Sequence, residues 1–143
     1  MTIPWLAAII PKREAKTGEM TTTIAPEVMA KYRRSAVARE EALQREAEQR
    51  RQTAWAVARR AARLLEAEFG ATRVVAFGSL VHGAWFGLRS DIDLAVEGIP
   101  PHMFWRAWCA LDRLDPTVSI DLTAIESAAK TLRDEIAKQG VPL

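Results

Sequence analysis

The sequence predicts an α/β domain preceded by a long helix, and three observations carry this prediction. Residues 27–69 contain no proline or glycine and are rich in alanine, arginine, glutamate and leucine. After residue 70, strand-like and helix-like segments alternate. The chain has 143 residues, of which 49% are hydrophobic and 27% charged, which is the size and composition of one globular domain with an appendage.

Residues 1–26 are expected to form a flexible tail, with a docking peptide as the alternative. Their most apolar stretch, residues 3–10, is interrupted by Pro4, and no basic residues precede it. It therefore has the features of neither a membrane span nor a signal peptide. Cys109 is the only cysteine, which excludes an intramolecular disulfide and a cysteine-cluster zinc site and fits a reducing cytoplasm.

The long helix is expected to begin at Pro26, which suits a first helical turn, and to be capped by Gly70. Its second half carries apolar residues spaced by three or four, so this half should pack on the body. These residues are Ala54, Ala58, Ala61, Leu65 and Phe69. Residues 27–53 have few apolar side chains and form an arm with three alternatives: it is solvated, broken near residues 50–53, or packed on a partner protein or a second copy.

The chain is expected to contain three strands and four helices, namely the long helix, a short helical stretch after the first strand and two further helices. Apolar or alternating patterns predict strands at residues 73–77, 91–97 and 118–123. Helical patterns lie at residues 103–114 and 127–139, so that helices and strands alternate as in α/β proteins. One set of residues in the first of these helices is spaced three apart and is expected in the core: Trp105, Trp108, Leu111 and Leu114.

Three aspartates are the main candidates for chemistry. Asp91 and Asp93 lie two apart on one predicted strand, so their side chains leave the same face about 7 Å apart. Asp121 is likewise a polar residue between apolar ones on the next predicted strand. If the two strands are neighbours, the three carboxylates converge. Clustered carboxylates repel one another unless cations neutralise them, and Mg²⁺ or Mn²⁺ would suit oxygen ligands. In the alternative, the three aspartates are unrelated surface groups.

A glycine-serine turn precedes these aspartates. Gly78 and Ser79 follow a buried strand, where glycine permits a tight turn and the close approach of a ligand. Serine can cap a helix whose free N–H groups attract phosphate. A phosphate-binding turn followed by a metal-binding carboxylate pair is what transfer from a nucleoside triphosphate requires.

This combination resembles a known family. Phe77-Gly78-Ser79 followed by Ser90-Asp91-Ile92-Asp93-Leu94 is similar to the Gly-Ser…Asp-x-Asp signature of the DNA polymerase β-like nucleotidyltransferase superfamily. The likeness is greatest to the minimal nucleotidyltransferases, the MntA-like antitoxins that are paired with HEPN toxins. It implies a small mixed sheet flanked by helices and covers about residues 55–143. The expected division of the chain is therefore a tail (1–26), an arm (27–53) and a nucleotidyltransferase domain (54–143).

The resemblance also implies roles for single residues. Asp91 and Asp93 would hold two Mg²⁺ ions on the triphosphate of ATP, with Mn²⁺ as a substitute. Asp121 would complete the second metal site and face the attacking hydroxyl, and Gly78 and Ser79 would bind the β- and γ-phosphates. In the antitoxin group the acceptor is a tyrosine of the partner toxin, which AMP disables.

Two more residues are expected to bind the nucleotide through the resemblance, His82 and Ser90. His82 stands where many relatives carry arginine, and the alternative is a loop histidine without a role. The spacer of residues 80–90 is one residue longer than the common pattern. Trp85 and Phe86 make this loop apolar, and packing over the sheet is favoured over stacking on a base.

The predicted function is AMP transfer from ATP to a hydroxyl of a HEPN-type toxin in the cytoplasm. The alternative is an antitoxin or scaffold that neutralises its partner by contact alone, with the arm as the binding surface. A small-molecule acceptor is disfavoured because the body is short. The net charge of +2 is too small to indicate nucleic-acid binding, and no segment suggests a membrane partner.

Overall fold

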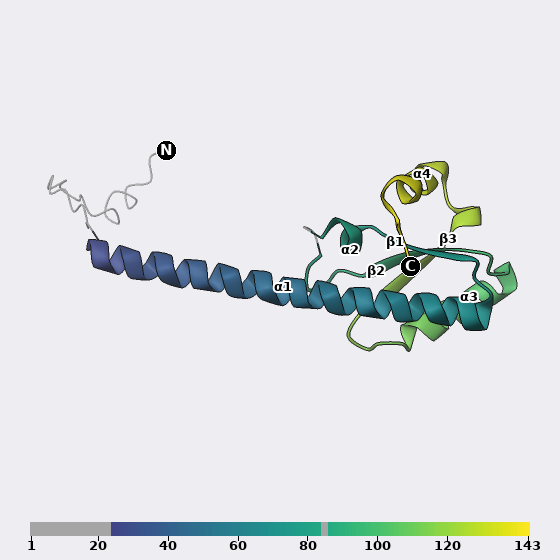
Figure 1. Ribbon diagram of the computed structural model, residues 1–143, viewed down its shortest axis with the longest axis horizontal. Helices are drawn as coiled ribbons and strands as arrows, with labels where there is room; N and C mark the ends of the chain where they lie inside the picture. Colours follow the sequence, from purple (N-terminus) through teal and green to yellow (C-terminus); the bar gives the residue numbers. More distant parts are fainter. Residues whose placement is uncertain (1–23, 84–85) are drawn as a thin grey trace, which may run out of the picture. The chain divides into compact units, whose positions relative to one another are not determined.

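A computed structural model describes residues 24–83 and 86–143 of the chain (Figure 1). Helices precede, connect and follow the strands of a small sheet. The elements are α1 (Pro26–Phe69), β1 (Arg73–Phe77), α2 (Ser79–His82), β2 (Ile92–Glu97), α3 (Pro101–Asp112), β3 (Ile120–Ala124), the 3₁₀ turn η2 (Ile125–Ser127), α4 (Lys130–Gln139) and β4 (Val141–Pro142).

The chain divides into two compact units, Met1–Ala36 and Val37–Leu143. In the first unit the structure describes residues 24–36, which contain the beginning of α1. The flexible tail expected at residues 1–26 therefore lies outside the described residues up to residue 23. The second unit holds the sheet and all the sites discussed below.

The sheet is mixed, with the strand order β3-β2-β1-β4. β1 is antiparallel to both β2 and β4, whereas β2 and β3 are parallel. The strands that carry Asp93 and Asp121 are therefore neighbours, as the convergence of the carboxylates requires, whereas Asp91, expected on the second strand, directly precedes β2. β4 was not expected, and its Pro142 is tolerated because an edge strand needs no N–H donor on its outer side.

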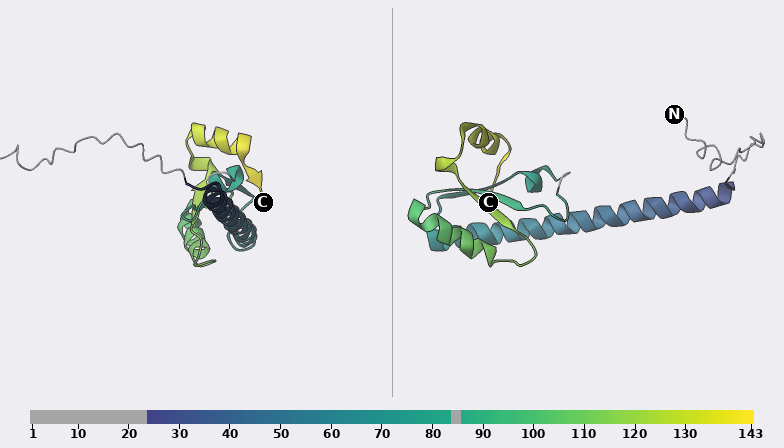
Figure 2. Two further views of the ribbon diagram at one scale, coloured as in Figure 1. Left: turned by 90° about the vertical axis from the view of Figure 1, so that its left-hand side faces the viewer. Right: turned by 180° about the vertical axis from the view of Figure 1, so that it is seen from behind.

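The two faces of the sheet bury different helices, because side chains alternate along each strand. Val74, Leu94 and Leu122 face the larger core, where they pack with Leu65 of α1 and Leu111 of α3. The opposite face buries a smaller group against α4, namely Val75, Phe77, Ala95 and Ile136. Figure 2 shows α4 on one side of the sheet and α3, with the second half of α1, on the other.

Helix α1 is continuous from Pro26 to Phe69, so the alternative of a break near residues 50–53 is wrong. Within residues 37–53 the apolar side chains of Val37 and Leu43 are exposed. Hydrogen bonds between residues four apart support a solvated helix there, from Gln44 to Glu40 and from Gln52 to Glu48, each 3.3 Å long. No helix within the described part of the chain has a stretch long and apolar enough to cross a membrane.

The core expected on α3 is wrong in one residue, since Trp105 is 69% exposed. Leu111 is buried and Leu114 packs against the core, while Trp108 is partly buried and donates its indole N–H to the Ile120 carbonyl at 3.2 Å. A spacing of three residues falls short of the 3.6 residues in a helical turn, so such a row drifts around the helix. The first member of the row has therefore left the buried face.

Candidate active site

Strands β2 and β3 place Asp93 and Asp121 directly opposite each other in the parallel register. Neighbouring strands lie about 4.8 Å apart, so the two side chains leave the same face of the sheet side by side. This is the face that α4 covers further along, because Ala95, two residues beyond Asp93, packs against Ile136. Asp93 is half-buried and Asp121 is exposed.

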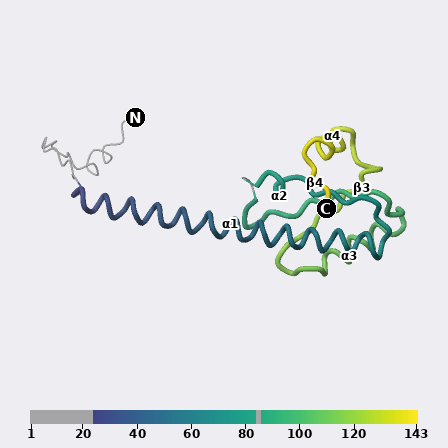
Figure 3. The backbone as a smooth tube through the Cα atoms, viewed as in Figure 1, coloured from purple at the N-terminus to yellow at the C-terminus, as the bar shows by residue number. Residues whose placement is uncertain are grey.

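Gly78 lies against the Asp93 carboxylate. β1 ends at Phe77, which is paired with Asp93 in the antiparallel register, and Gly78 follows it (the path from β1 through α2 to β2 can be followed in Figure 3). The backbone of Gly78 has φ +71° and ψ −146°, a conformation that residues other than glycine rarely adopt. A Cβ atom at this position would overlap Oδ2 of Asp93. Both the turn and the close approach therefore require glycine.

The short helix α2, which begins at Ser79, is held in place by Arg51 of α1. The Arg51 guanidinium donates from Nε to the Leu80 carbonyl at 3.1 Å and from Nη2 to the Val81 carbonyl at 3.4 Å. Carbonyls at a helix end have no partner within the helix, and the arginine supplies one. No sequence signal indicated this role, because Arg51 is one of many arginines on a polar helix.

His82 and Ser90 lie between the Gly78 turn and Asp91 along the chain. His82 is the last residue of α2 and its side chain is exposed. The Ser90 hydroxyl accepts a hydrogen bond from the Gly87 N–H at 2.8 Å and so closes the loop that leads to Asp91. Phe86 is 5% exposed and packs into the larger core, as expected, whereas Trp85 lies outside the described residues.

Negative charge accumulates around Asp93. Partial burial raises the pKa of its carboxyl, and the charges of Asp121, Asp91 and Glu135 raise it further. The salt bridges found among the described residues lie elsewhere, so none of these four carboxylates is paired with a cation there. The site therefore holds unbalanced negative charge.

Glu135 is a second residue near the site that no sequence signal indicated. It belongs to α4 and precedes Ile136, whose side chain packs on the aspartate-bearing face of the sheet. The helix itself was expected, but the pattern did not say which face of the sheet it would cover. Without that information a charged residue on an amphipathic helix looks like any solvated residue.

The aspartates suit a metal ion that arrives with a nucleotide. Among residues 24–83 and 86–143, no three histidine, cysteine or acidic side chains are gathered closely enough to hold a metal by themselves. Mg²⁺, however, usually takes one or two protein carboxylates and completes its shell with substrate phosphates and water. Asp93 and Asp121, which lie side by side on β2 and β3, fit this donor set, and Asp91 directly precedes β2.

The raised pKa of Asp93 predicts how stability depends on pH. In the folded state the carboxyl binds its proton more tightly than in the unfolded chain, so its ionisation favours unfolding. The protonated Asp93 carboxyl therefore stabilises the folded state. This stabilisation is fully present below the pKa of the unfolded chain and is lost as the pH rises through the pKa of the folded state. We expect Asp93→Asn, which cannot ionise, to stabilise the metal-free protein at neutral pH but not in acid.

Urea unfolding in EDTA at both pH values measures this effect. Asp112→Asn, an exposed site on α3, is the control for the loss of one surface carboxylate and should not stabilise the protein at neutral pH. Equal midpoints for the wild type and Asp93→Asn at neutral pH would contradict the prediction.

The protein is similar to known proteins in its fold rather than in its overall sequence. No protein-family model matches the sequence, and no curated protein matches it. Among solved structures, a chain of a mutant toxin–antitoxin complex MntA-HepT is 25% identical, with a TM-score of 0.50, and the match covers 59% of this chain and 69% of that one. The chain has the fold of an MntA-type nucleotidyltransferase.

Two further structures are similar. A chain of another MntA-HepT mutant has 20% identity and a TM-score of 0.50, with 59% of this chain and 69% of that chain covered. A minimal nucleotidyltransferase has 28% identity and a TM-score of 0.47, with 70% of this chain and 95% of that chain covered. The resemblance inferred from the Gly-Ser and Asp-x-Asp motifs is confirmed, together with the mixed sheet that it implied.

Proposed function

We propose that the protein is a nucleotidyltransferase-type antitoxin that transfers AMP from ATP to a tyrosine hydroxyl of a HEPN-type toxin. The observation that carries the proposal is the meeting of Asp93, Asp121 and the Gly78 turn on one face of the sheet. The likeness to a chain of the MntA-HepT complex supports the antitoxin role.

The residues would divide the work as follows. The turn at Gly78 and Ser79 would bind the β- and γ-phosphates, and Asp91, Asp93 and Asp121 would hold Mg²⁺ that enters with ATP. When bound, the metal supplies charge stabilisation for the entering and leaving oxygens. The acceptor oxygen bonds to the α-phosphorus, the bond to the β-phosphate oxygen breaks, and pyrophosphate leaves. Asp121, the exposed carboxylate, faces the acceptor hydroxyl and takes its proton.

Labelled ATP tests the proposal. The protein, Mg²⁺ and the product of the adjacent gene, which we expect to be a HEPN-type toxin, are incubated with ATP labelled at the α- or the γ-phosphate. We expect the α-label on a tyrosine of the toxin and no γ-label. Transfer of the γ-label would mean phosphorylation, and no label from either ATP would remove the enzymatic function.

The second candidate is an antitoxin that acts by contact alone. The observation that favours it is the polar surface of α1 over residues 37–53, from which Val37 and Leu43 are exposed. The double variant Asp91→Ala, Asp93→Ala separates the two functions in cells that express the toxin. Continued protection by this variant would show that contact suffices, whereas loss of protection with retained toxin binding would favour catalysis.

A further inference from the structure

The chain from Gly78 to Gly83 forms a single helical turn that cannot fix its own orientation. The His82 N–H donates to the Gly78 carbonyl at 3.2 Å, and the Gly83 N–H donates to the Ser79 carbonyl at 3.0 Å. One isolated helical turn is not stable in water, because a few hydrogen bonds do not offset the cost of ordering the backbone. Contacts with the rest of the protein must therefore set the orientation of the turn, and with it that of Gly78 and Ser79.

The first of these contacts is the side chain of Leu80, which is fully buried in the larger core. It attaches the turn to the body of the protein. Hydrophobic burial, however, has no preferred direction. This anchor alone would leave the turn free to tilt about the Leu80 side chain.

Arg51 of α1 supplies the directional contact. Its guanidinium donates from Nε to the Leu80 carbonyl at 3.1 Å and from Nη2 to the Val81 carbonyl at 3.4 Å. Because the guanidinium is planar and rigid, two bonds from it fix the orientation of the turn as well as its position. Gly83 lets the guanidinium lie this close, since a Cβ atom there would be 3.0 Å from Cζ of Arg51.

Arg51 is itself held by a rigid element. It is half-buried and lies on the continuous helix α1, just before Ala54, the first residue of that helix that is buried in the core. Within residues 24–83 and 86–143, no carboxylate forms a salt bridge with Arg51. No ion pair there competes with the two carbonyls for the guanidinium.

The other end of the same turn meets the carboxylate site. Gly78 lies against Asp93 so closely that a Cβ atom would overlap the Asp93 Oδ2. Asp93 in turn lies opposite Asp121 in the sheet. The turn therefore lies between a guanidinium on α1 and a carboxylate on β2. A tilt at the Arg51 end would change the gap between Gly78 and Asp93.

We propose that Arg51 is a positioning residue for ATP, which holds the turn at Gly78 and Ser79 in the orientation that receives the β- and γ-phosphates. The inference rests on the proposed function for the identity of the ligand. Arg51 acts through the carbonyls of Leu80 and Val81 rather than on the nucleotide itself. Its loss therefore weakens ATP binding without removing a group that takes part in the chemical step.

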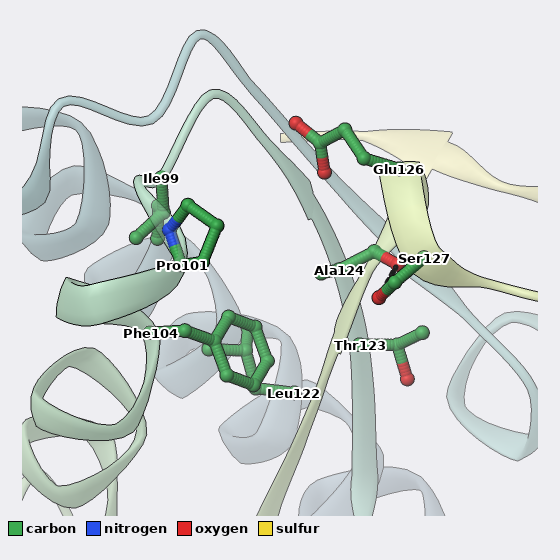
Figure 4. Close-up of a pocket in the computed structure, with 8 residues that line it drawn as sticks. All are labelled: Ile99, Pro101, Phe104, Leu122, Thr123, Ala124, Glu126 and Ser127. Atoms are coloured by element: carbon green, nitrogen blue, oxygen red, sulfur yellow. Dashed lines mark hydrogen bonds between the residues drawn. The ribbon is translucent and has the colours of Figure 1, made fainter.

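A pocket beside the end of β3 offers an internal reference for this effect (Figure 4). Its volume is about 510 Å³, Phe104 and Leu122 belong to its apolar wall, and Glu126 and Ser127 stand at its polar side. None of the residues that line it is basic, so a triphosphate would have no arginine or lysine partner there. None belongs to the turn, so a ligand in this pocket would not respond to Arg51.

Arg51→Met tests the inference, because methionine keeps an unbranched stem and a high helix propensity but removes both donors. The matched control is Arg63→Met, at an exposed position of the same helix. For Arg51→Met we expect the Kd for Mg²⁺-ATP and the KM for ATP to rise about tenfold, a size that the loss of hydrogen bonds from a charged group can account for. The kcat should stay within about twofold, as when binding shared by the ground state and the transition state is lost.

Three results would overturn the inference. The first is a wild-type Kd for Mg²⁺-ATP in Arg51→Met, and the second is an equal loss of affinity in Arg63→Met. The third is a lower kcat without a higher KM, which would assign Arg51 to the chemical step. If circular dichroism shows that Arg51→Met is unfolded, Arg51→Lys replaces it. The lysine keeps the charge but lacks the planar fork that holds both carbonyls, so we expect ATP affinity to fall in this variant too.

The location of ATP and the chemical step are tested separately. Ser127→Trp, at an exposed position of the pocket beside β3, should leave the Kd for Mg²⁺-ATP unchanged. Weaker ATP binding in this variant would place ATP in that pocket and overturn the inference. If the wild type binds Mg²⁺-ATP but labels no toxin, the enzymatic function fails, and the Kd of Arg51→Met still decides the role of Arg51. A wild type that does not bind Mg²⁺-ATP would overturn both.

Discussion

Asp93→Asn is expected to lower AMP transfer by at least about a hundredfold. Removing a group that only orients a metal ligand lowers activity by up to about a hundredfold, and removing a proposed ligand itself should cost at least as much. The substitution keeps the size of the side chain but removes the negative charge that would hold Mg²⁺ with ATP beside Gly78 in the proposed reaction. The control is Glu97→Gln, four residues along the same strand on the same side. Glu97 pairs with Arg73 at 3.1 Å, and its exposed salt bridge contributes at most about 1 kcal/mol.

The two variants are compared by the initial rate of α-label transfer and by the affinity for ATP in Mg²⁺. Asp93→Asn should lose transfer and bind Mg²⁺-ATP more weakly, while its circular dichroism remains that of the wild type. Glu97→Gln should keep transfer within about twofold, since a weak exposed pair alone is removed. Full transfer by Asp93→Asn would remove the aspartates from the mechanism, and an equal loss in Glu97→Gln would assign the loss to the strand rather than to the charge.

Much of the fold could be predicted because local patterns coincide with the final elements. The apolar run at residues 73–77 became β1, and residues 27–69, which contain no proline or glycine, became a helix that ends before Gly70. β4 could not be predicted, since Val141 and Pro142 have no strand pattern and are extended only because they pair with β1. β3 starts at Ile120 rather than at residue 118. α4 starts at Lys130 rather than at residue 127, because residue 127 belongs to a 3₁₀ turn instead of the first helical turn.

The candidate site was predictable where it depends on periodicity within one strand. Asp91 and Asp93 are two residues apart, a spacing that predicts side chains on one face of a strand, and Gly78 marks a turn after a buried strand. The pairing of Asp93 with Asp121 needed the parallel register of β2 and β3, which no local pattern contains. Arg51 and Glu135 approach the site from α1 and α4, and their contribution depends on how distant helices pack.

Gly78→Ala is expected to destabilise the protein and to remove most of the transfer activity. The backbone at residue 78 lies in a region essentially restricted to glycine, where a side chain costs about 1–3 kcal/mol, and the new Cβ would overlap Asp93 Oδ2. Gly70→Ala is the matched control. Gly70 has the same φ of +71°, but a Cβ there would meet nothing within 4 Å, so only a backbone cost of about 1–2 kcal/mol is expected.

The contact with Asp93 can be separated from the backbone strain by a double-mutant cycle. In an Asp93→Ala background the overlapping carboxylate is absent, so Gly78→Ala should cost less free energy of unfolding than it does in the wild type. The difference between the two costs measures the coupling, which for residues in contact is about 0.5–3 kcal/mol. Urea unfolding of the four proteins in EDTA gives this value. A coupling near zero would mean that the Gly78 backbone and the Asp93 side chain are independent, and the Gly78 turn would then not be fitted to the carboxylate site.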